Sequence, residues 1–152
     1  MKTYFLLRRQ VIPKPLDAVF GFFESPANLE RITPAEVGFN ILTPQPITMR
    51  TGAVLDYTIR LFGIPVRWTT QIVGYDPPYR FADVALKSPY SFWHHTHSFE
   101  PTPGGTVMTD QVKYVMPFGW IGQIAHALFV KRRLEKIFDY RAEVIEQLLE
   151  EQ

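Results

Sequence analysis

Apolar and polar residues near the start of the chain follow first the pattern of a strand and then that of a helix. Residues Thr3 to Ile12 read as a strand, and prolines end it. Apolar residues then recur at helical spacing, at Leu16, Val19, Phe20 and Phe23. Ser25 followed by Pro26 is typical of the beginning of a second helix. We therefore predict one strand followed by two short helices.

Beyond the second helix the apolar period changes to two, which indicates strands. Proline and glycine signals such as "FGIP", "DPP" and "TPGG" separate them, and such short links favour antiparallel hairpins. The predicted strands are Val37–Leu42, Ala53–Phe62, Val66–Tyr75, Arg80–Leu86, Tyr90–Glu100 and Thr106–Met116.

From about Trp120 to the end the pattern is helical again. An apolar stripe with steps of three and four runs through Ala127, Val130, Leu134, Ile137, Arg141, Val144 and Leu148. Because Ile121, Ala125 and Leu128 point away from this stripe, we expect a kink there or a second covered surface. A curved sheet of seven antiparallel strands can bury one face only against this terminal helix, which predicts an α+β fold.

The chain length of 152 residues predicts a single domain spanning 1–152. Lysine plus arginine number 16 against 15 acidic residues, so we expect no nucleic-acid partner. The chain has no cysteine, its first apolar run is too short for a secretion signal, and no apolar run reaches the ~20 residues of a membrane span. We expect a cytoplasmic protein. Sequence motifs for nucleotide binding, serine hydrolysis and zinc proteolysis are absent.

Three of the four histidines lie in "SFWHHTHSFEP", from Ser91 to Pro101. Since alternate strand residues share a face, His95 and His97 lie between Trp93 and Phe99 on one side, and His94 lies on the other. A hairpin centred on "TPGG" sets four inward pairs about 5 Å apart: Phe99 with Met108, His97 with Asp110, His95 with Val112, and Trp93 with Tyr114.

An imidazole beside a carboxylate in apolar surroundings has several interpretations. His97 and Asp110 could satisfy each other structurally, contact a polar part of a ligand, or act as general acid and base with His95 as a second proton donor. The sequence gives only a weak indication of metal, because Asp110 is the sole obvious third ligand beside the two histidines. We expect no metal and no cofactor.

Arg141 is a charged residue in the apolar stripe of the terminal helix, and a buried arginine needs a carboxylate partner. Asp83 and Asp110 are the candidates, and an anchor for a ligand oxygen is the alternative role. Further inward residues of two strands are Leu55, Tyr57, Ile59, Trp68, Thr70 and Ile72. The segments "TPQPITMRTG" and "PFGWIG" are candidate gates at the end of the sheet.

Several stretches resemble those of one known superfamily: "IPKPLDAVFGFFESPANLERITP", "GIPVRWTTQI", "YDPPYRFADV", "WHHTHSF", "GGTVMTDQVKYVMPFG" and "IFDYR". Together they make nearly the whole chain similar to the START-like (SRPBCC, helix-grip) superfamily, in its polyketide cyclase/dehydrase and ligand-binding group. The resemblance implies an elongated apolar cavity between the sheet and the terminal helix. The superfamily includes lipid carriers, hormone receptors, quinone binders and some enzymes, so the fold leaves the function open.

We therefore predict a protein that binds a hydrophobic small molecule, such as a lipid, an isoprenoid or quinone, or a polyketide. The expected ligand contacts are Trp93, His95, His97, Tyr114, Arg141, Tyr57, Trp68 and Asp83. One alternative is a cyclase/dehydratase-type enzyme that uses His97, Asp110 and His95. Another is a regulatory or interaction module without catalysis. The sequence also allows a homodimer, and "FGWIGQIAHALFVKRR" could touch a membrane surface transiently through its aromatic and basic residues.

Overall fold

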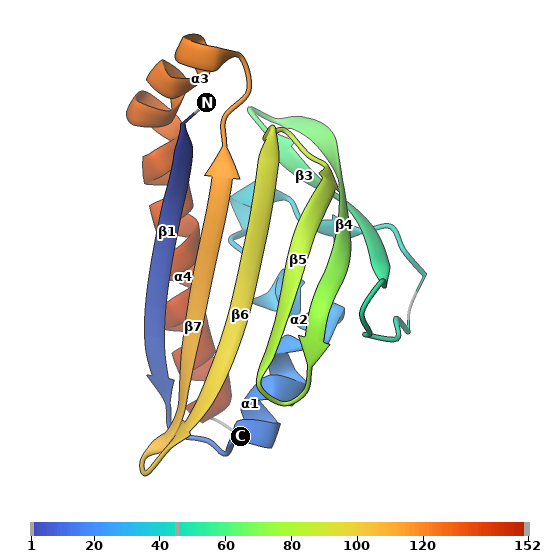
Figure 1. The fold of residues 1–152 in the computed structure, drawn as a ribbon, viewed down its shortest axis with the longest axis vertical. Helices are drawn as coiled ribbons and strands as arrows, with labels where there is room; N and C mark the ends of the chain where they lie inside the picture. The colour runs from blue at the N-terminus through green and yellow to red at the C-terminus, as the bar shows by residue number, and fades with distance from the viewer. Residues whose placement is uncertain (1, 45, 151–152) are drawn as a thin grey trace.

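An antiparallel sheet forms the main layer of the protein (Figure 1), and it consists of seven strands. The structure is a computed structural model and describes residues 2–44 and 46–150. The strands lie in the order β1-β7-β6-β5-β4-β3-β2. Their bounds are β1 Thr3–Ile12, β2 Asn40–Ile41, β3 Val54–Leu61, β4 Ile64–Asp76, β5 Arg80–Lys87, β6 Phe92–Thr102 and β7 Gly105–Val115. The predicted α+β fold is confirmed.

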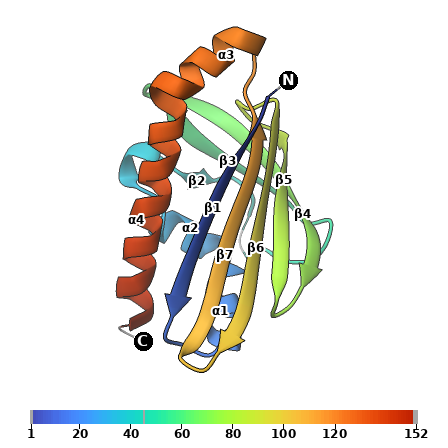
Figure 2. The ribbon, with the colours of Figure 1, turned by 60° about the vertical axis from the view of Figure 1, so that its left-hand side comes forward.

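The helices cover one face of the curved sheet. A long helical segment begins where β7 ends and returns along β1 (Figure 2), while the two short helices lie behind the lower half of the sheet (Figure 1). The helical elements are α1 Leu16–Phe23, α2 Pro26–Arg31, the 3-10 turn η1 Ala35–Val37, α3 Gly119–Ala125, the π-helical turn η2 His126–Val130 and α4 Lys131–Glu150. The core lies between this helical layer and the concave face of the sheet.

The tight link between β3 and β4 shows how local sequence sets the hairpins. Phe62 and Gly63 have positive φ values of 51° and 79°, as the two central residues of a type I′ turn require. Phe62 is 89% exposed, so its side chain adds nothing to the core. The turn holds Leu61 opposite Ile64 and thereby fixes the register of both strands.

The strand predicted from Val37 to Leu42 is wrong over most of its length. Pro34 begins the 3-10 turn η1, and Gly38, with φ 63° in the left-handed region, ends it. Only Asn40 and Ile41 remain to pair with β3, so β2 is a two-residue strand. The other predicted strand ends differ from the structure by a few residues.

The C-terminal helical segment confirms the expected kink and corrects the stripe. The π-helical turn η2 separates α3 from α4, and α3 bends away from the axis of α4 in Figure 2. A π-turn holds more residues than an α-turn, so it shifts the buried face by about one position. The buried side chains of α4 are Leu134, Phe138, Arg141, Ile145 and Leu149. Ala127 is exposed, which the predicted stripe had wrong, and Ile137, Val144 and Leu148 are half-buried.

Candidate functional site

The hairpin of β6 and β7 has the predicted register. His97 lies opposite Asp110, His95 opposite Val112, and Trp93 opposite Tyr114. His95 is 6% exposed and His97 3%, whereas His94 is half-buried on the other face of the sheet. The three histidines therefore separate as expected, with two in the core.

The short hydrogen bonds of this region run diagonally between strands. His95 Nε2 donates to Asp110 Oδ1 over 2.8 Å, and His97 Nε2 donates to Asp83 Oδ2 over 2.9 Å. Asp83 comes from β5, where it lies opposite His95. The directly opposite pair, His97 Nδ1 and Asp110 Oδ1, is 3.4 Å apart. Asp110 is therefore bound to His95 more closely than to its register partner.

Arg141 of α4 reaches the same group from the helical layer. Its Nη2 lies 3.1 Å from Asp110 Oδ1 and 3.4 Å from His97 Nδ1. The guanidinium carbon also sits 5.5 Å from the ring centre of Phe23 and 5.6 Å from that of Phe138, so two aromatic rings flank the cation. Of the two predicted carboxylate partners, Asp110 is the one in contact. We call Asp83, His95, His97, Asp110 and Arg141 the polar layer.

The polar layer lies between two apolar clusters. Phe81 and Phe99 belong to the cluster on one side, and the Phe81 ring stacks on His97 at 4.4 Å. Trp93, Leu134 and Phe138 belong to the cluster on the other side. The imidazoles of His95 and His97 stack on each other at 3.8 Å between the two clusters.

Burial and charge push the pKa values of this group apart. Burial opposes the ionised form of Asp110, but Arg141 and the hydrogen bonds from both histidines hold its pKa well below the ordinary carboxyl range. Burial also opposes the charged form of His97, yet hydrogen bonds to Asp110 and Asp83 outweigh it and raise its pKa. Burial, together with the charge on His97, lowers the pKa of His95. The pKa values of the two neighbouring imidazoles are therefore shifted in opposite directions.

Three atoms of the polar layer are also placed as potential metal ligands. One nitrogen from each of His95 and His97 and one oxygen of Asp83 lie within 4.8 Å of one another. The sequence pattern pointed to Asp110 as the third ligand, whereas the structure supplies Asp83. That residue could be found only by pairing β5 with β6.

A pocket opens between the sheet and the C-terminal helical segment, beside the ends of β1 and β7. It has a volume of about 740 Å³. Its lining comprises Lys2, Tyr4, Phe5, Leu6, Tyr114, Trp120, Gln123, Ile124, His126, Ala127, Lys131, Leu134 and Glu135. At its wall a hydrogen bond of 2.6 Å joins the Tyr114 hydroxyl and His126 Nε2, and the Tyr4 ring stacks on His126 at 3.5 Å.

Sequence reasoning missed most of this pocket. The sequence pattern assigns no role to His126 and predicts Tyr4 only as part of a strand. The available signal was the pairing of the first and last strands, which sets Tyr4 opposite Tyr114. Burial lowers the pKa of His126, and the charges of Lys131 and Lys2 lower it further.

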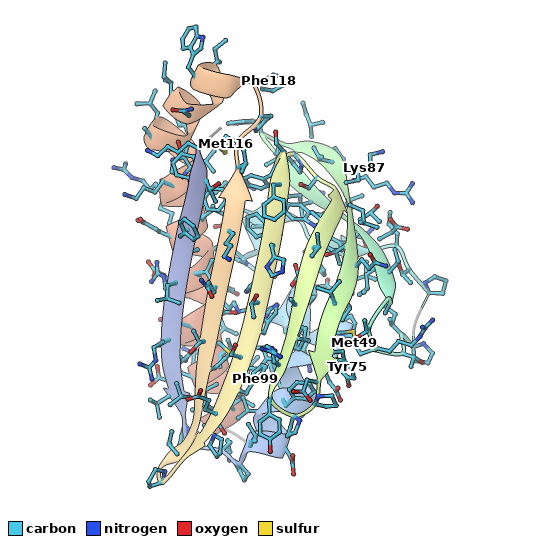
Figure 3. The ribbon with its side chains drawn as sticks, in the orientation of Figure 1. Met49, Tyr75, Lys87, Phe99, Met116 and Phe118 are labelled. Carbon is cyan, nitrogen blue, oxygen red and sulfur yellow. The ribbon has the colours of Figure 1, made fainter. Side chains whose placement is uncertain are left out.

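A second pocket of about 320 Å³ lies at the other end of the sheet, beside α1. Met49 and Tyr75 line it and can be located in Figure 3. Met49 belongs to the first predicted gate, 43–52, of which position 45 lies outside the described residues. The second predicted gate, 117–122, contributes Trp120 to the larger pocket.

The predicted catalytic residues and the pockets lie apart. Of the predicted ligand contacts, Tyr114 alone lines either described pocket. Trp68 and Trp93 are buried in one apolar cluster, against which Tyr57 packs with its ring stacked on Trp68 at 6.0 Å. Leu134 borders the larger pocket, and Phe138, one helical turn further along, lies 5.6 Å from His95. Neighbouring side chains of α4 therefore contact the pocket and the polar layer, respectively.

The sheet, the two short helices after β1 and the long C-terminal helix together define a helix-grip fold. Comparison with solved structures agrees. Protein CV1439 from Chromobacterium violaceum superposes with a TM-score of 0.72 at 14% identity, covering 96% of this chain and 97% of that one. TTHA0849 from Thermus thermophilus gives 0.72 at 15% identity over the same shares. Ara h 8.0201 gives 0.62 at 14% identity, covering 99% of this chain and all (100%) of its own.

These similarities are structural, and at such identities they show the fold alone. Neither a known protein family nor a curated protein shows significant sequence similarity to the chain. Among the described residues, the helices are too short or too polar to cross a membrane.

Proposed function

We propose that the protein binds a hydrophobic small molecule, such as a lipid, an isoprenoid or quinone, or a polyketide, in the pocket between β1, β7 and the C-terminal helical segment. The observation that carries the proposal is the pocket of about 740 Å³. Ligand sites typically measure about 300–1,000 Å³ and combine apolar walls with a few converging polar groups. The aromatic and aliphatic lining beside Tyr114 and His126 has this character.

The polar part of the lining favours a ligand with an anionic or oxygen-bearing end. The lining carries two cations, Lys2 and Lys131, against one anion, Glu135, so its net charge is positive. A carboxylate or carbonyl group could bind there while the apolar part contacts Leu6, Ile124 and Leu134.

The experiment measures the binding of a fluorescent fatty acid to purified protein that has first been stripped of lipid. Ala127 is exposed at the pocket wall, so Ala127→Trp fills the pocket without disturbing the core. We expect the variant to lose affinity by at least about tenfold, or about 1.4 kcal/mol. The control is Glu143→Trp, at an exposed position of α4 that lines neither described pocket. Equal affinity in the two variants would contradict the proposed pocket.

Around the pocket mouth, α3 and η2 expose an unusual amount of apolar surface. We call this the α3 apolar surface: Phe118 (80% exposed), Trp120 (70%), Ile121 (58%), Ile124 (50%), Leu128 (61%) and Phe129 (62%). Trp120 and Ile124 also line the pocket. A water-facing apolar patch of this size normally marks an interaction site.

We propose that the α3 apolar surface touches an anionic membrane when ligand is exchanged. Lys131, Arg132 and Arg133 follow directly after it, and basic residues beside an apolar helix face are attracted to acidic headgroups. The proposal predicts cosedimentation with vesicles containing phosphatidylglycerol, and its loss in Phe129→Glu. The matched control is Leu7→Glu, at an equally exposed (62%) residue of the outer sheet face. A stable homodimer that dissociates in Phe129→Glu, without vesicle binding, would contradict the membrane role.

A further inference from the structure

Three donor atoms of the polar layer converge on one point. Asp83 Oδ2 lies 2.9 Å from His97 Nε2 and 3.8 Å from His95 Nδ1. In a tetrahedral zinc site with bonds of about 2.0–2.1 Å, neighbouring donor atoms are about 3.3 Å apart. The two distances lie on either side of that value, and one nitrogen of each histidine and one oxygen of Asp83 all lie within 4.8 Å of one another.

Asp110 orients both imidazoles for this purpose. Its Oδ1 accepts the hydrogen bond from His95 Nε2 and lies 3.4 Å from His97 Nδ1. The nitrogens that face away from Asp110 are the two that face Asp83. His95 donates with Nε2 and therefore offers a lone pair on Nδ1, whereas His97 releases the Nε2 proton that it donates to Asp83 when it binds the ion. A carboxylate behind a ligand histidine is the usual support of a metal site.

The net charge of the polar layer favours the binding of a cation. With both imidazoles neutral, Asp83 and Asp110 contribute two negative charges and Arg141 one positive charge, in a region where His95, His97 and Asp110 are buried. His95 Nδ1 and Asp83 Oδ2 face each other beyond hydrogen-bond distance, so two electron-rich atoms meet across a gap of 3.8 Å. A cation between them removes that repulsion and balances the charge.

We propose that Asp83, His95 and His97 bind a divalent transition-metal ion, with Asp110 as the orienting carboxylate. Two imidazoles and one carboxylate suit Zn²⁺, and three protein ligands leave one position for water. From the sequence we expected no metal, because Asp110 was the only third ligand in view. Asp83 changes that expectation, since it completes the ligand set while Asp110 stays behind the histidines.

The test titrates chelator-treated protein with Zn²⁺ by calorimetry and with Co²⁺ by visible absorption. We expect one ion per chain and a Zn²⁺-dependent rise in the melting temperature. Asp110→Asn should weaken Zn²⁺ binding by roughly 10- to 100-fold, as loss of an orienting carboxylate does, and Asp83→Asn should weaken it further. His94→Gln removes an imidazole from the same strand but the opposite face, and should bind as the unaltered protein does.

A second measurement needs no substitution, in case Asp83→Asn does not fold. Imidazole nitrogen NMR of the Zn²⁺-loaded protein should show the ion on Nδ1 of His95 and on Nε2 of His97. A flat Zn²⁺ titration of the unaltered protein would overturn the proposal and leave a proton on His97 as the balancing cation. Binding that disappears in His94→Gln, or NMR shifts confined to His94 and His126, would overturn it as well.

Discussion

Arg141 donates a hydrogen bond to Asp110 across the interface between α4 and the sheet, with 3.1 Å between Nη2 and Oδ1. Both side chains are nearly inaccessible, at 10% and 3% exposure. Removing one member of a buried ion pair leaves the other charge without a partner and lowers the free energy of unfolding by about 3–5 kcal/mol. We therefore predict that Arg141→Met lowers the free energy of unfolding by this amount, measured by urea denaturation.

The double variant Arg141→Met/Asp110→Asn provides the control for this pair. Because the double variant removes both charges, it should lose less free energy of unfolding than the two single variants lose together. The difference should lie within the roughly 0.5–3 kcal/mol found for contacting residues. Strict additivity would show that the two side chains do not stabilise each other.

Gly122 holds α3 against the end of β7. A Cβ atom at this position would lie 1.8 Å from the carbonyl oxygen of Pro117, which is backbone and cannot swing aside. We predict that Gly122→Ala displaces α3 and raises hydrogen exchange across Gly119–Ala125. The matched control is Gly21→Ala in α1, where a Cβ meets nothing within 4 Å. It should instead stabilise the protein by about 0.5–1 kcal/mol. Unchanged exchange in Gly122→Ala would contradict the close packing of α3.

His126 makes the stability of the folded protein depend on pH in the mildly acidic range. Burial, followed by the charges of Lys131 and Lys2, lowers its pKa below the ordinary 6.5. Below pH 6.5 the unfolded chain takes up a proton at this residue that the folded chain still refuses. Stability is therefore complete above that pH and is lost as the pH falls toward the folded pKa.

Imidazole NMR titration checks this prediction. The midpoint for His126 should lie below 6.5 and should move upward in Lys131→Met, which removes one of the two cations. A midpoint at or above 6.5 in the unaltered protein would be inconsistent with the buried, lysine-flanked position.

Because the polar layer lies apart from the larger pocket, a substitution in the layer should leave ligand binding in the pocket nearly unchanged. His97 lines neither described pocket, so His97→Gln should change the affinity for a fluorescent fatty acid by less than about twofold, well under 1.4 kcal/mol. The melting temperature of the variant should be recorded in parallel, since the buried hydrogen bond to Asp83 is lost. A tenfold loss of affinity in a folded variant would place the ligand against the polar layer and favour the acid/base role of His97, Asp110 and His95.

Much of the sheet could be predicted because strand faces alternate. The register of β6 and β7 followed from one turn and from two rows of apolar residues, and it holds along the whole hairpin. The same reasoning could not find the short strand β2. There Pro34 and Gly38 impose a local turn that overrides the apolar pattern between them.

The candidate sites were harder to predict, because they depend on contacts between elements far apart in sequence. Asp83 joins the histidines through β5, and Tyr4 joins Tyr114 through β1. Hydrogen bonds also choose partners by side-chain reach, so Asp110 binds His95 although His97 is its register partner. The stripe of α4 was displaced by the π-helical turn η2; the residue pattern indicated a kink near it but not the extra residue that shifts the buried face.

The position of the polar layer has a consequence for how the strands find their alignment during folding. Face alternation penalises a slip of one residue, but a slip of two keeps every apolar side chain on its proper face. Along β6, such a slip would carry one histidine into the site of the other and the second histidine out of the layer, so that either Asp83 or Asp110 would lose its imidazole donor. Unpaired carboxylates in the core are strongly unfavourable. The polar layer thus disfavours two-residue shifts of the strand register that apolar packing alone would tolerate. The hydrogen bond from Arg141 to Asp110 also fixes the position of α4 along the sheet.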